Sequence, residues 1–556
     1  MARKRVAEAG LPPPPSRTRT RILLFLLAVL PFLNGLPNDF TYDDLRVVRD
    51  DARLESPARV AEILSSEYLS DSTGLYRPVT VLSYAVQRWV QGPSASGLRL
   101  VNVLLHAAVT LLLLEWLLAL GLDGRVSMAA AGLFAVLPIH VEAVTSIVGR
   151  AELLAAAFSL GAALAFLRAS RERESRWRWG AASAAAFALA LLSKESAAVL
   201  PALLLLAEAF RRDPESPSPL AAWKRAAALA GGGAAILGAF LGLRLLLLGS
   251  VIRATTGLPS EAINPLASLP PLVRALNGAN LLWLYAAKSL VPVNLSADYS
   301  AWAIRPLTGL ADARLWLGAA TWTACGAIAF RLRRRWPEAS FGFLFFPAAF
   351  LVTANLAFPV GTVFAERLTY LPSAGVALLA SAILASVVRR VPRLATLTFR
   401  EASLAAVLVV AYLPVTVLRN RDWRDDRTLY ASIVAAQPES ARGHYLLGVD
   451  SYRRGDLVGA EAPLRRAVEI HPRYPHAWNV LAEVLWRQRK WSEALAAQRV
   501  TVELLPDSID ALFHLALWNA QVGRTDEARR LLLQGRERFP KEEAFVMALR
   551  ELDAGP

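Results

Sequence analysis

The sequence predicts an all-α protein in which a polytopic bundle of membrane helices precedes a soluble array of helical repeats. Three observations support this prediction: an apolar composition, a series of charge-poor segments, and a fixed period near the C-terminus. Of the 556 residues, 55% are hydrophobic and only 19% are charged. A soluble domain of this size would expose more charge, so the composition indicates a membrane protein.

Residues 1–21 are basic and rich in proline, and we expect them to form a cytoplasmic tail. The apolar stretch that follows, Ile22 to Leu36, resembles the core of a signal peptide. It lacks a convincing small-residue cleavage site before Asn38. We therefore interpret it as an uncleaved first membrane span.

A series of apolar segments predicts a membrane domain over residues 22–418 with eleven spans, give or take two. Several segments approach the roughly 20 apolar residues that cross a hydrocarbon core of about 30 Å. Two long loops, 38–98 and 249–312, are predicted to face outward, and the stretch Leu281 to Val291 is predicted to be interfacial or re-entrant. The segments are 22–37, 99–119, 126–141, 151–168, 179–193, 196–210, 226–248, 313–330, 341–358, 371–388 and 402–418.

The net charge of +15 is distributed as a topology signal and not as a groove for nucleic acid. Basic clusters alternate with charge-poor loops at 3–5, 17–21, 168–178, 211–225, 331–335 and 389–393. Short loops rich in Lys and Arg stay in the cytoplasm, so the N-terminus is predicted inside and the C-terminus outside. The one cysteine, Cys325, lies in an apolar segment, and no disulfide framework is predicted.

The C-terminal part repeats itself every 34 residues. Proline recurs at this spacing, and leucine, alanine and small residues keep the same phase: Pro438, Pro472, Pro506, Pro540; Ala460, Ala494, Ala528; Leu447, Leu481, Leu515; Gly448, Ala482, Ala516. This period is typical of tetratricopeptide repeats. We predict a connector over 419–438, then three repeats and a capping helix over 439–556. Such arrays bind proteins, and Trp478 is the predicted acceptor-docking residue.

Ionisable residues gather in the loops that the topology places outside. Such groups are costly at membrane depth, so they are normally paired or functional. Their convergence on one face predicts a polar cavity that could hold an anionic, lipid-linked substrate. The residues are Asp43, Asp44, His140, Glu142, Arg150, Glu152, Lys194, Glu195, Glu366, Arg367 and the run 419–427.

Eight short strings in this chain resemble the transmembrane and tetratricopeptide-repeat O-mannosyltransferases and their bacterial relatives, which are glycosyltransferases of the GT-C fold. The resemblance covers nearly the whole chain in the same order, repeats included. The strings are FTYDD (40–44), YRPVTVLS (76–83), LVNVLLH (100–106), LPIHVEA (137–143), VGRAELL (148–154), LSKE (192–195), AERLTYLP (365–372) and RNRDW (419–423).

The resemblance implies transfer of a sugar, mannose in this family, from a polyprenyl-phosphate donor to Ser or Thr hydroxyls of extracytoplasmic proteins docked by the repeats. It makes Asp43 the general base, with Asp44 orienting it or contacting the acceptor. Guanidinium groups match phosphate geometry, so Arg77, Arg150 and Arg367 are the candidates for the donor phosphate. We expect a bacterial inner-membrane protein with the site and the repeats on the periplasmic side.

Several alternatives remain open from the residues alone. Asp43 and Asp44 could form a solvated turn, or ligate a divalent metal, although no third acidic ligand is near them in sequence and metal independence is favoured. Glu152 could simply pair with Arg150, and Glu195 with Lys194. The acceptor could be a glycan or a lipid instead of a protein. The chain could also be a non-catalytic scaffold that anchors the repeats for envelope assembly.

Overall fold

The computed structural model describes residues 17–69, 74–172, 174–211, 219–249, 263–300, 302–390 and 400–554. Within these ranges every regular element is helical, which confirms the all-α prediction. The described residues divide into two compact units. The first holds the described residues up to 249 together with Leu266–Ala297 and Pro306–Leu429. The second holds Asp298–Arg305 and the described residues from Tyr430 onward, with the short stretch 263–265.

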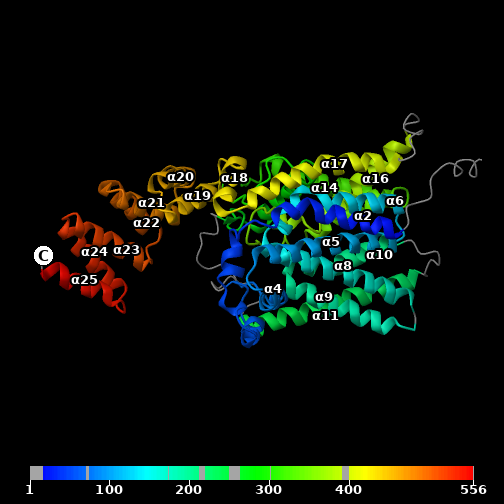
Figure 1. Cartoon of the computed structure of the whole chain (residues 1–556), viewed down its shortest axis with the longest axis horizontal. Helices are drawn as coiled ribbons and strands as arrows, with labels where there is room; N and C mark the ends of the chain where they lie inside the picture. Colours follow the sequence, from blue (N-terminus) through cyan, green and yellow to red (C-terminus); the bar gives the residue numbers. More distant parts are fainter. Residues whose placement is uncertain are drawn as a thin grey trace, which may run out of the picture. The chain divides into compact units, whose positions relative to one another are not determined.

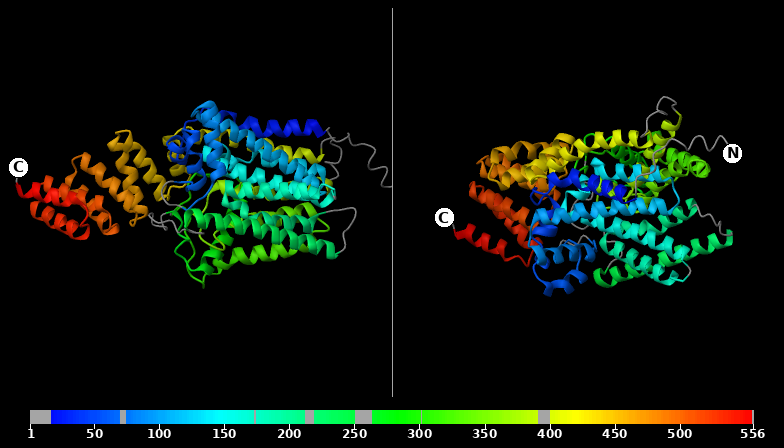
Figure 2. Two further views of the ribbon diagram at one scale, coloured as in Figure 1. Left: turned by 90° about the horizontal axis from the view of Figure 1, so that it is seen from below. Right: turned by 45° about the vertical axis from the view of Figure 1, so that its right-hand side comes forward.

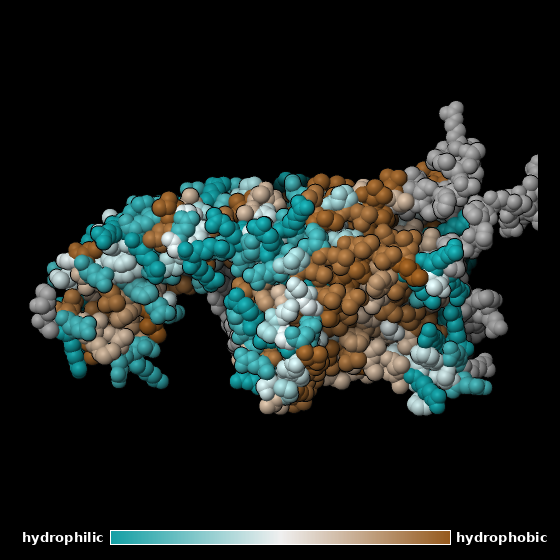
Figure 3. Space-filling view, in the orientation of Figure 1, coloured by the Kyte–Doolittle hydropathy of each residue, from teal (hydrophilic) through white to brown (hydrophobic). Residues whose placement is uncertain are grey.

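The long helices of the first unit run side by side in a bundle (Figures 1 and 2). In the space-filling view, apolar side chains form a band across these helices, with hydrophilic residues at both ends (Figure 3). The helices are α2 (Arg17–Val29), α5 (Ala95–Ala119), α6 (Gly124–Val136), α8 (Arg150–Arg171), α9 (Arg176–Ser193), α10 (Leu200–Phe210), α11 (Pro219–Leu248), α13 (Pro271–Leu290), α14 (Ala313–Leu332), α15 (Pro337–Ala349), α16 (Ser373–Arg390) and α17 (Arg400–Asn420).

The eleven apolar segments of the sequence all overlap helices of this bundle, but the number of membrane crossings stays a prediction. Among the described residues, five helical segments are long and apolar enough to cross a membrane. A sixth is formed if the pair Gly124–Val136 and Pro138–Val144, bent by 51°, is one span. The remaining helices are shorter or less apolar. The five segments are Arg17–Gly35, Ala95–Ala119, Ile147–Arg171, Lys224–Leu248 and Ala313–Leu332.

Helix α13 contains the stretch 281–290 that was predicted to be interfacial or re-entrant. Near its start, Arg274 donates to the carbonyl of Ala357, and soon after its end the amide of Ser296 donates to Glu366. Ala357 and Glu366 belong to the same loop, between α15 and α16. Arg274 and Ser296 therefore both bond to this loop, and an interfacial or re-entrant path for α13 stays a prediction.

The first long loop folds into a helical cap. Its elements are η2 (Leu45–Arg49), η3 (Ala52–Leu54), η4 (Pro57–Arg59), α3 (Val60–Ser65) and α4 (Pro78–Gln91). One face of α4 buries Val81 and Tyr84 over Val48 and Leu54 in a small apolar core. On another face Val90 is 84% exposed. An amphipathic helix of this kind suits the surface of a membrane, as its sequence predicts.

The second unit consists of paired helices in sequence order. The pairs are α19 (Ala441–Arg453) with α20 (Leu457–Ile470), α21 (Pro475–Arg487) with α22 (Trp491–Leu504), and α23 (Ile509–Gln521) with α24 (Thr525–Arg538), followed by α25 (Glu543–Ala554). Small residues permit the close packing within a pair. A Cβ on Gly448 of α19, for example, would lie 2.6 Å from Leu464 of α20. The first unit ends at Leu429, inside α18 (Asp426–Ala436).

Candidate active site

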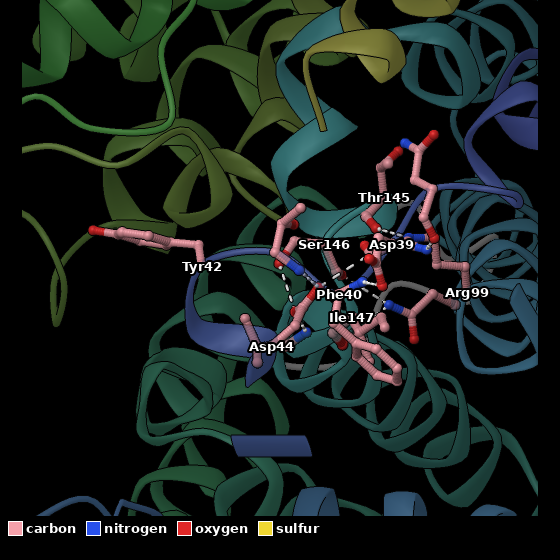
Figure 4. A network of polar contacts seen from close by, with 12 residues as sticks. Asp39, Phe40, Tyr42, Asp44, Arg99, Thr145, Ser146 and Ile147 are labelled. Atoms are coloured by element: carbon pink, nitrogen blue, oxygen red, sulfur yellow. Dashed lines mark hydrogen bonds and ion pairs between the residues drawn. The ribbon is translucent and has the colours of Figure 1, made fainter. Parts of the chain in front are cut away.

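The acidic pair lies in a strained turn between the first span and the cap. Tyr42 has a φ of 55°, a left-handed conformation that a bulky residue adopts only when its surroundings enforce it. Its amide donates to Asp426, which follows the last span, at 2.8 Å. In Figure 4 the Tyr42 ring points away from the Asp44 network. The turn thus sends residues 42 and 44 in different directions.

Asp44 is fully buried and held on several sides. One carboxylate oxygen accepts from the amide of Val148 at 2.9 Å and from the hydroxyl of Ser146 at 3.3 Å. The other lies 3.9 Å from the guanidinium of Arg99 (Figure 4). Burial raises the pKa of Asp44 to about 6, against the opposing effects of Arg99 and the backbone donors. This carboxylate is therefore bonded inside the protein and has no exposed surface.

Arg99 is a site residue that sequence reasoning missed. It starts the second predicted span, where it was counted among apolar neighbours. Its guanidinium is 1% exposed, donates to the carbonyl of Thr145 at 2.9 Å, and also donates to the carbonyls of Asn38 and Asp39. It therefore fixes the chain immediately before the acidic pair. A single arginine at a span boundary was the available signal, because an ionisable residue there needs partners.

Asp43 is half-buried, and its charge acts on the guanidinium of Arg367 and on the hydroxyl of Tyr68. Arg367 itself pairs with Glu142, whose other oxygen accepts the Arg367 amide at 2.9 Å. Burial alone would lower the pKa of Arg367, but Glu142 and Asp43 raise it. Three loops that are far apart in sequence thus meet beside Asp43.

Two further ion pairs lie near this group, with partners different from those the sequence suggested. Lys194 pairs with Glu152, and Arg77 pairs with Glu195 at 2.9 Å. The alternative that Glu152 pairs with Arg150 and Glu195 with Lys194 is not what the structure shows. Neighbours in a helical turn or a loop point in different directions, so each residue finds its partner on another element.

The ion pairs belong to one electrostatic cluster. Burial lowers the pKa of Lys194 to about 8, with Arg77 and Arg367 contributing in the same direction and Glu152 opposing them. Burial would raise the pKa of Glu195, but Arg77 lowers it. We call this set the charged cluster. It comprises Asp43, Arg77, Glu142, Glu152, Lys194, Glu195 and Arg367.

Asp43 differs from the other acids of the charged cluster. Each glutamate has a basic partner, whereas the Asp43 carboxylate makes neither a hydrogen bond nor an ion pair to any residue in the described part of the chain. Its solvent exposure is intermediate. It is therefore the acid of the cluster best placed to act on a bound molecule.

Arg150 lies outside the charged cluster although the sequence placed it with Arg77 and Arg367. It is 1% exposed, donates to Asn102 at 2.9 Å and to the carbonyl of Leu98 at 2.8 Å, and stacks over Tyr84. These contacts hold the starts of α8 and α5 together. Asn102 also donates to the carbonyl of Ser146 at 3.0 Å, so the same network supports the loop under Asp44.

His140 and Glu366 occupy separate buried positions. His140 contacts the hydroxyl of Ser373 at 2.7 Å and packs against Phe134 and Tyr370, in the core between helices. Glu366 accepts from Ser296 at 2.5 Å and lies 3.6 Å from Arg419. Neither residue is part of the charged cluster, because each is bonded to other partners inside the protein.

In the second unit, Trp478 takes part in the junction between repeats. Its indole nitrogen donates to the carbonyl of Pro472 at 2.8 Å, and the ring packs on the repeat core. His444 makes the equivalent contact to Pro438 at 3.0 Å one repeat earlier. The position therefore has a packing role, and docking of an acceptor by Trp478 stays a prediction.

No group of three or more His, Cys, Asp or Glu side chains in the described ranges is arranged to hold a metal ion. The two adjacent aspartates do not share a ligand position, because Asp44 is turned into the protein. Independence of a metal ion, which the sequence favours, therefore stays a prediction.

Family models match three parts of the chain. Residues 82–231 match the model described as Dolichyl-phosphate-mannose-protein mannosyltransferase, and residues 259–326 match Protein O-mannosyl-transferase TMTC, DUF1736. Residues 416–475 and 464–509 match Tetratricopeptide repeat. The resemblance to the transmembrane and tetratricopeptide-repeat O-mannosyltransferase family is confirmed. The first of these models covers the three glutamates and Lys194 of the charged cluster, but not Asp43, Arg77 or Arg367.

Three curated animal proteins are similar to the chain. It is 28% identical to Protein O-mannosyl-transferase F38B6.6 of Caenorhabditis elegans, over 82% of this chain and 63% of the relative. It is 28% identical to Protein O-mannosyl-transferase TMTC4 of Mus musculus, over 79% and 65%. It is 24% identical to Protein O-mannosyl-transferase Tmtc3 of Drosophila melanogaster, over 98% and 61%. The chain thus spans less than two thirds of the length of these relatives.

Proposed function

We propose that this protein is an integral membrane glycosyltransferase that moves mannose from a polyprenyl-phosphate donor to Ser or Thr hydroxyls of a protein. The proposal is supported by the family match and by the charged cluster at one end of the bundle. The observation that carries it is the free carboxylate of Asp43, half-exposed beside paired charges. A non-catalytic anchor would have no reason to retain such a cluster.

In the proposed reaction, the acceptor hydroxyl attacks the anomeric carbon of the sugar. The new bond forms between the hydroxyl oxygen and this carbon, while the bond from the carbon to the phosphate oxygen breaks. Asp43 takes the hydroxyl proton, and the polyprenyl phosphate leaves with the electron pair. A carboxylate without a fixed partner suits this role, because a general base must be free to accept a proton from the substrate.

Asp44 is proposed as a positioning residue for Asp43. Its bonds to Val148 and Ser146 anchor the turn from one side, and Asp426 anchors Tyr42 from the other. A base must be held within a fraction of an ångström of its productive geometry, so such a support is expected around it. The earlier alternative, in which Asp44 contacts the acceptor, is disfavoured by its complete burial.

The donor phosphate would be held by Arg367, whose guanidinium is 30% exposed, with Arg77 as a second cation. Both already pair with a glutamate, so phosphate binding would require them to share or exchange that partner. Arg150 is not a donor ligand in this proposal, because its guanidinium is buried and bonds to Asn102 and Leu98. The polyprenyl phosphate leaves as an anion and needs no proton, so cationic side chains are what stabilise it.

Acceptor docking by the repeats rests on the path of the chain. The last bundle helix, α17, ends at Asn420, which accepts from Thr145 at 2.7 Å close to the acidic pair. The chain therefore leaves the bundle at the end that holds the site and continues into the repeats. The basic loops at the other end of the bundle support a site and repeats outside the cytoplasm, on the periplasmic side if the source is bacterial.

The proposal is tested with the purified protein, mannosyl polyprenyl phosphate and Ser/Thr-containing protein acceptors, with mass spectrometry as the readout. We expect hexose on acceptor hydroxyls, with the same rate in the presence of a chelator. Transfer only to a glycan or lipid acceptor would contradict the acceptor assignment. Loss of activity on chelation, restored by Mg²⁺ or Mn²⁺, would contradict the metal-independent mechanism.

A further inference from the structure

A further arginine lies in α11, a helix that packs against α9 and α10 at the edge of the bundle (Figure 1). Arg244 is the one charged residue of 226–248. Its neighbours Leu245 and Leu246 are 51% and 84% exposed, whereas Arg244 is 8% exposed. An arginine near the end of a membrane helix usually extends toward the headgroups. Here the helix directs its leucines outward and its charge into the protein.

The guanidinium of Arg244 has few bonds for its charge. It donates to the carbonyl of Gly74 at 2.6 Å, and its central carbon lies 5.9 Å from the ring centre of Phe240. Its Nε is buried and has no hydrogen-bond partner, and no acid in the described ranges forms an ion pair with it. A neutral amide could donate to Gly74 equally well. Because a buried cation is costly without an anion, the positive charge indicates a ligand.

The contacts of Arg244 place it beside Arg77 and Glu195 of the charged cluster. Gly74, which accepts from Arg244, lies three residues before Arg77. In the same segment the amide of Tyr76 donates to Glu195 at 3.2 Å, and Arg77 pairs with Glu195. The charge of Arg244 acts on this carboxylate as well. Arg77 and Arg244 therefore both lie near Glu195.

Two groups of this region lack an ion-pair partner among the described residues, the acid Asp43 and the cation Arg244. The other members of the charged cluster are paired, as Arg77 with Glu195, Lys194 with Glu152 and Arg367 with Glu142. The proposed reaction needs one free group of each sign, a base for the hydroxyl proton and a cation for the leaving phosphate. In a single displacement these two stand on opposite sides of the anomeric carbon, so they need not contact each other.

We propose that Arg244 binds the phosphate of the lipid-linked donor, as a third cation beside Arg77 and Arg367. A guanidinium can donate two parallel bonds to a phosphate. Arg77 and Arg367 would have to share or exchange a glutamate, whereas Arg244 would give up no ion pair. The polyprenyl chain would lie in the bilayer, against the exposed leucines of α11. This inference rests on the proposed function and names a further residue of the same site.

The first test is a donor titration with the purified full chain. Arg244→Gln should lower kcat/KM for mannosyl polyprenyl phosphate by at least about tenfold, since a bond between charged groups is lost, and Arg244→Lys should restore part of it. The KM for the acceptor should not change, whereas a general loosening of the site would alter it. A wild-type value of kcat/KM for the donor in Arg244→Gln would overturn the proposal.

Arg274→Gln is the matched control. Arg274 is also 8% exposed, donates to the carbonyl of Ala357 and has a buried Nε without a hydrogen-bond partner. It lies in α13, which contributes no residue to the charged cluster. Its kcat/KM for the donor should stay at the wild-type value. An equal fall in both variants would overturn the proposal, because it would reflect only the loss of a buried charge.

A binding measurement separates this inference from the proposed function. Thermal unfolding of the full chain in phosphatidylcholine is followed with polyprenyl monophosphate, phosphatidylglycerol or inorganic phosphate. Polyprenyl monophosphate should raise the midpoint of the wild type and of Arg274→Gln, and much less that of Arg244→Gln. This pattern without transfer by the wild type would reject the proposed function and keep the phosphate site. Equal shifts in the two variants, or shifts as large with phosphatidylglycerol or inorganic phosphate, would overturn the donor assignment.

Discussion

Asp43 and Asp44 are neighbours in the chain but have opposite surroundings. One carboxylate is half-exposed with no bonded partner among the described residues, and the other is enclosed by backbone donors and Arg99. The difference comes from the helical turn that starts at Asp43, in which successive side chains are about 100° apart. In the proposed mechanism, Asp43 is the reactive group of the acidic pair and Asp44 holds it in position.

The first prediction concerns the base. Asp43→Asn should lower mannosyl transfer by at least about 10²-fold, because an amide cannot take the proton of the attacking hydroxyl. The protein should remain folded, since Asp43 holds no structural bond. Asp50→Asn, an exposed aspartate in the same loop, is the control and should keep its activity. Transfer by Asp43→Asn at the wild-type rate would reject the base assignment.

The second prediction concerns pH and Asp44. Because burial raises its pKa from 3.8 to about 6, the folded state holds a proton that the unfolded state has lost between these values. The contribution of Asp44 to folding stability therefore falls as pH rises from about 4 to about 6, by a few kcal/mol at most. In thermal unfolding in detergent, the midpoint of Asp44→Asn should therefore rise relative to that of the wild type as pH increases over this range.

Asp50→Asn is again the comparison for this pH series. The Asp50 carboxylate is exposed beside Arg49, which lowers its pKa, so its removal should bring no such gain. A difference between wild type and Asp44→Asn that is constant from pH 4 to 6.5 would show that the buried carboxyl does not titrate there.

At the scale of elements, the loop from 144 to 149 is the support on which the acidic turn rests. Val148 and Ser146 bond Asp44, and the carbonyls of Thr145 and Ser146 receive Arg99 and Asn102. The loop closes tightly: a Cβ on Gly149 would lie 2.2 Å from the carbonyl oxygen of Ala143. A backbone atom cannot move aside as a flexible side chain can.

The third prediction follows from this contact. Gly149→Ala should lower the free energy of unfolding by about 1–3 kcal/mol and reduce transfer, because the loop that holds Asp44 must shift. Gly161→Ala, inside helix α8, which starts directly after Gly149, meets no atom within 4 Å and should be neutral or slightly stabilising. Equal melting points and activities for the two variants would contradict the role of the loop.

In the whole molecule, we expect the helix bundle to carry out transfer and the repeats to dock the acceptor. The fourth prediction is that deletion of residues 441–556 reduces transfer to a folded protein acceptor by roughly 10²-fold, through loss of effective concentration. Transfer to a short soluble peptide should be nearly unchanged. Undiminished transfer to the protein would assign the repeats to assembly instead of acceptor docking.

The fifth prediction concerns topology. In a Cys325→Ser background, cysteines placed at Asp50 and Arg334 should react with an impermeant maleimide from opposite sides of the membrane, because seven predicted spans lie between them. Labelling from the same side would mean an even number of crossings, as when α13 spans the bilayer. The native chain has a single cysteine, so this background needs one substitution.

The all-helical class, the repeats and the loops that hold the charged residues could all be predicted from the order of residues. These features are local: hydropathy periods and a 34-residue spacing depend only on the order of residues. Asp43 could be selected in the same way, by its context in a short string. The pairing of Glu152 with Lys194 and of Glu195 with Arg77 could not, since no spacing encodes which loops meet.

Only the tertiary structure decided the separate roles of Asp43 and Asp44 and the removal of Arg150 from the set of exposed cations. It also introduced Arg99 and Asp426 as supports, from positions 55 and 382 residues further along the chain than Asp44. Whether a charge is free or bound depends on what packs around it. The pairing of these charges depends on which helix ends meet in the folded protein. Contacts between such distant segments produce no repeating pattern in the sequence.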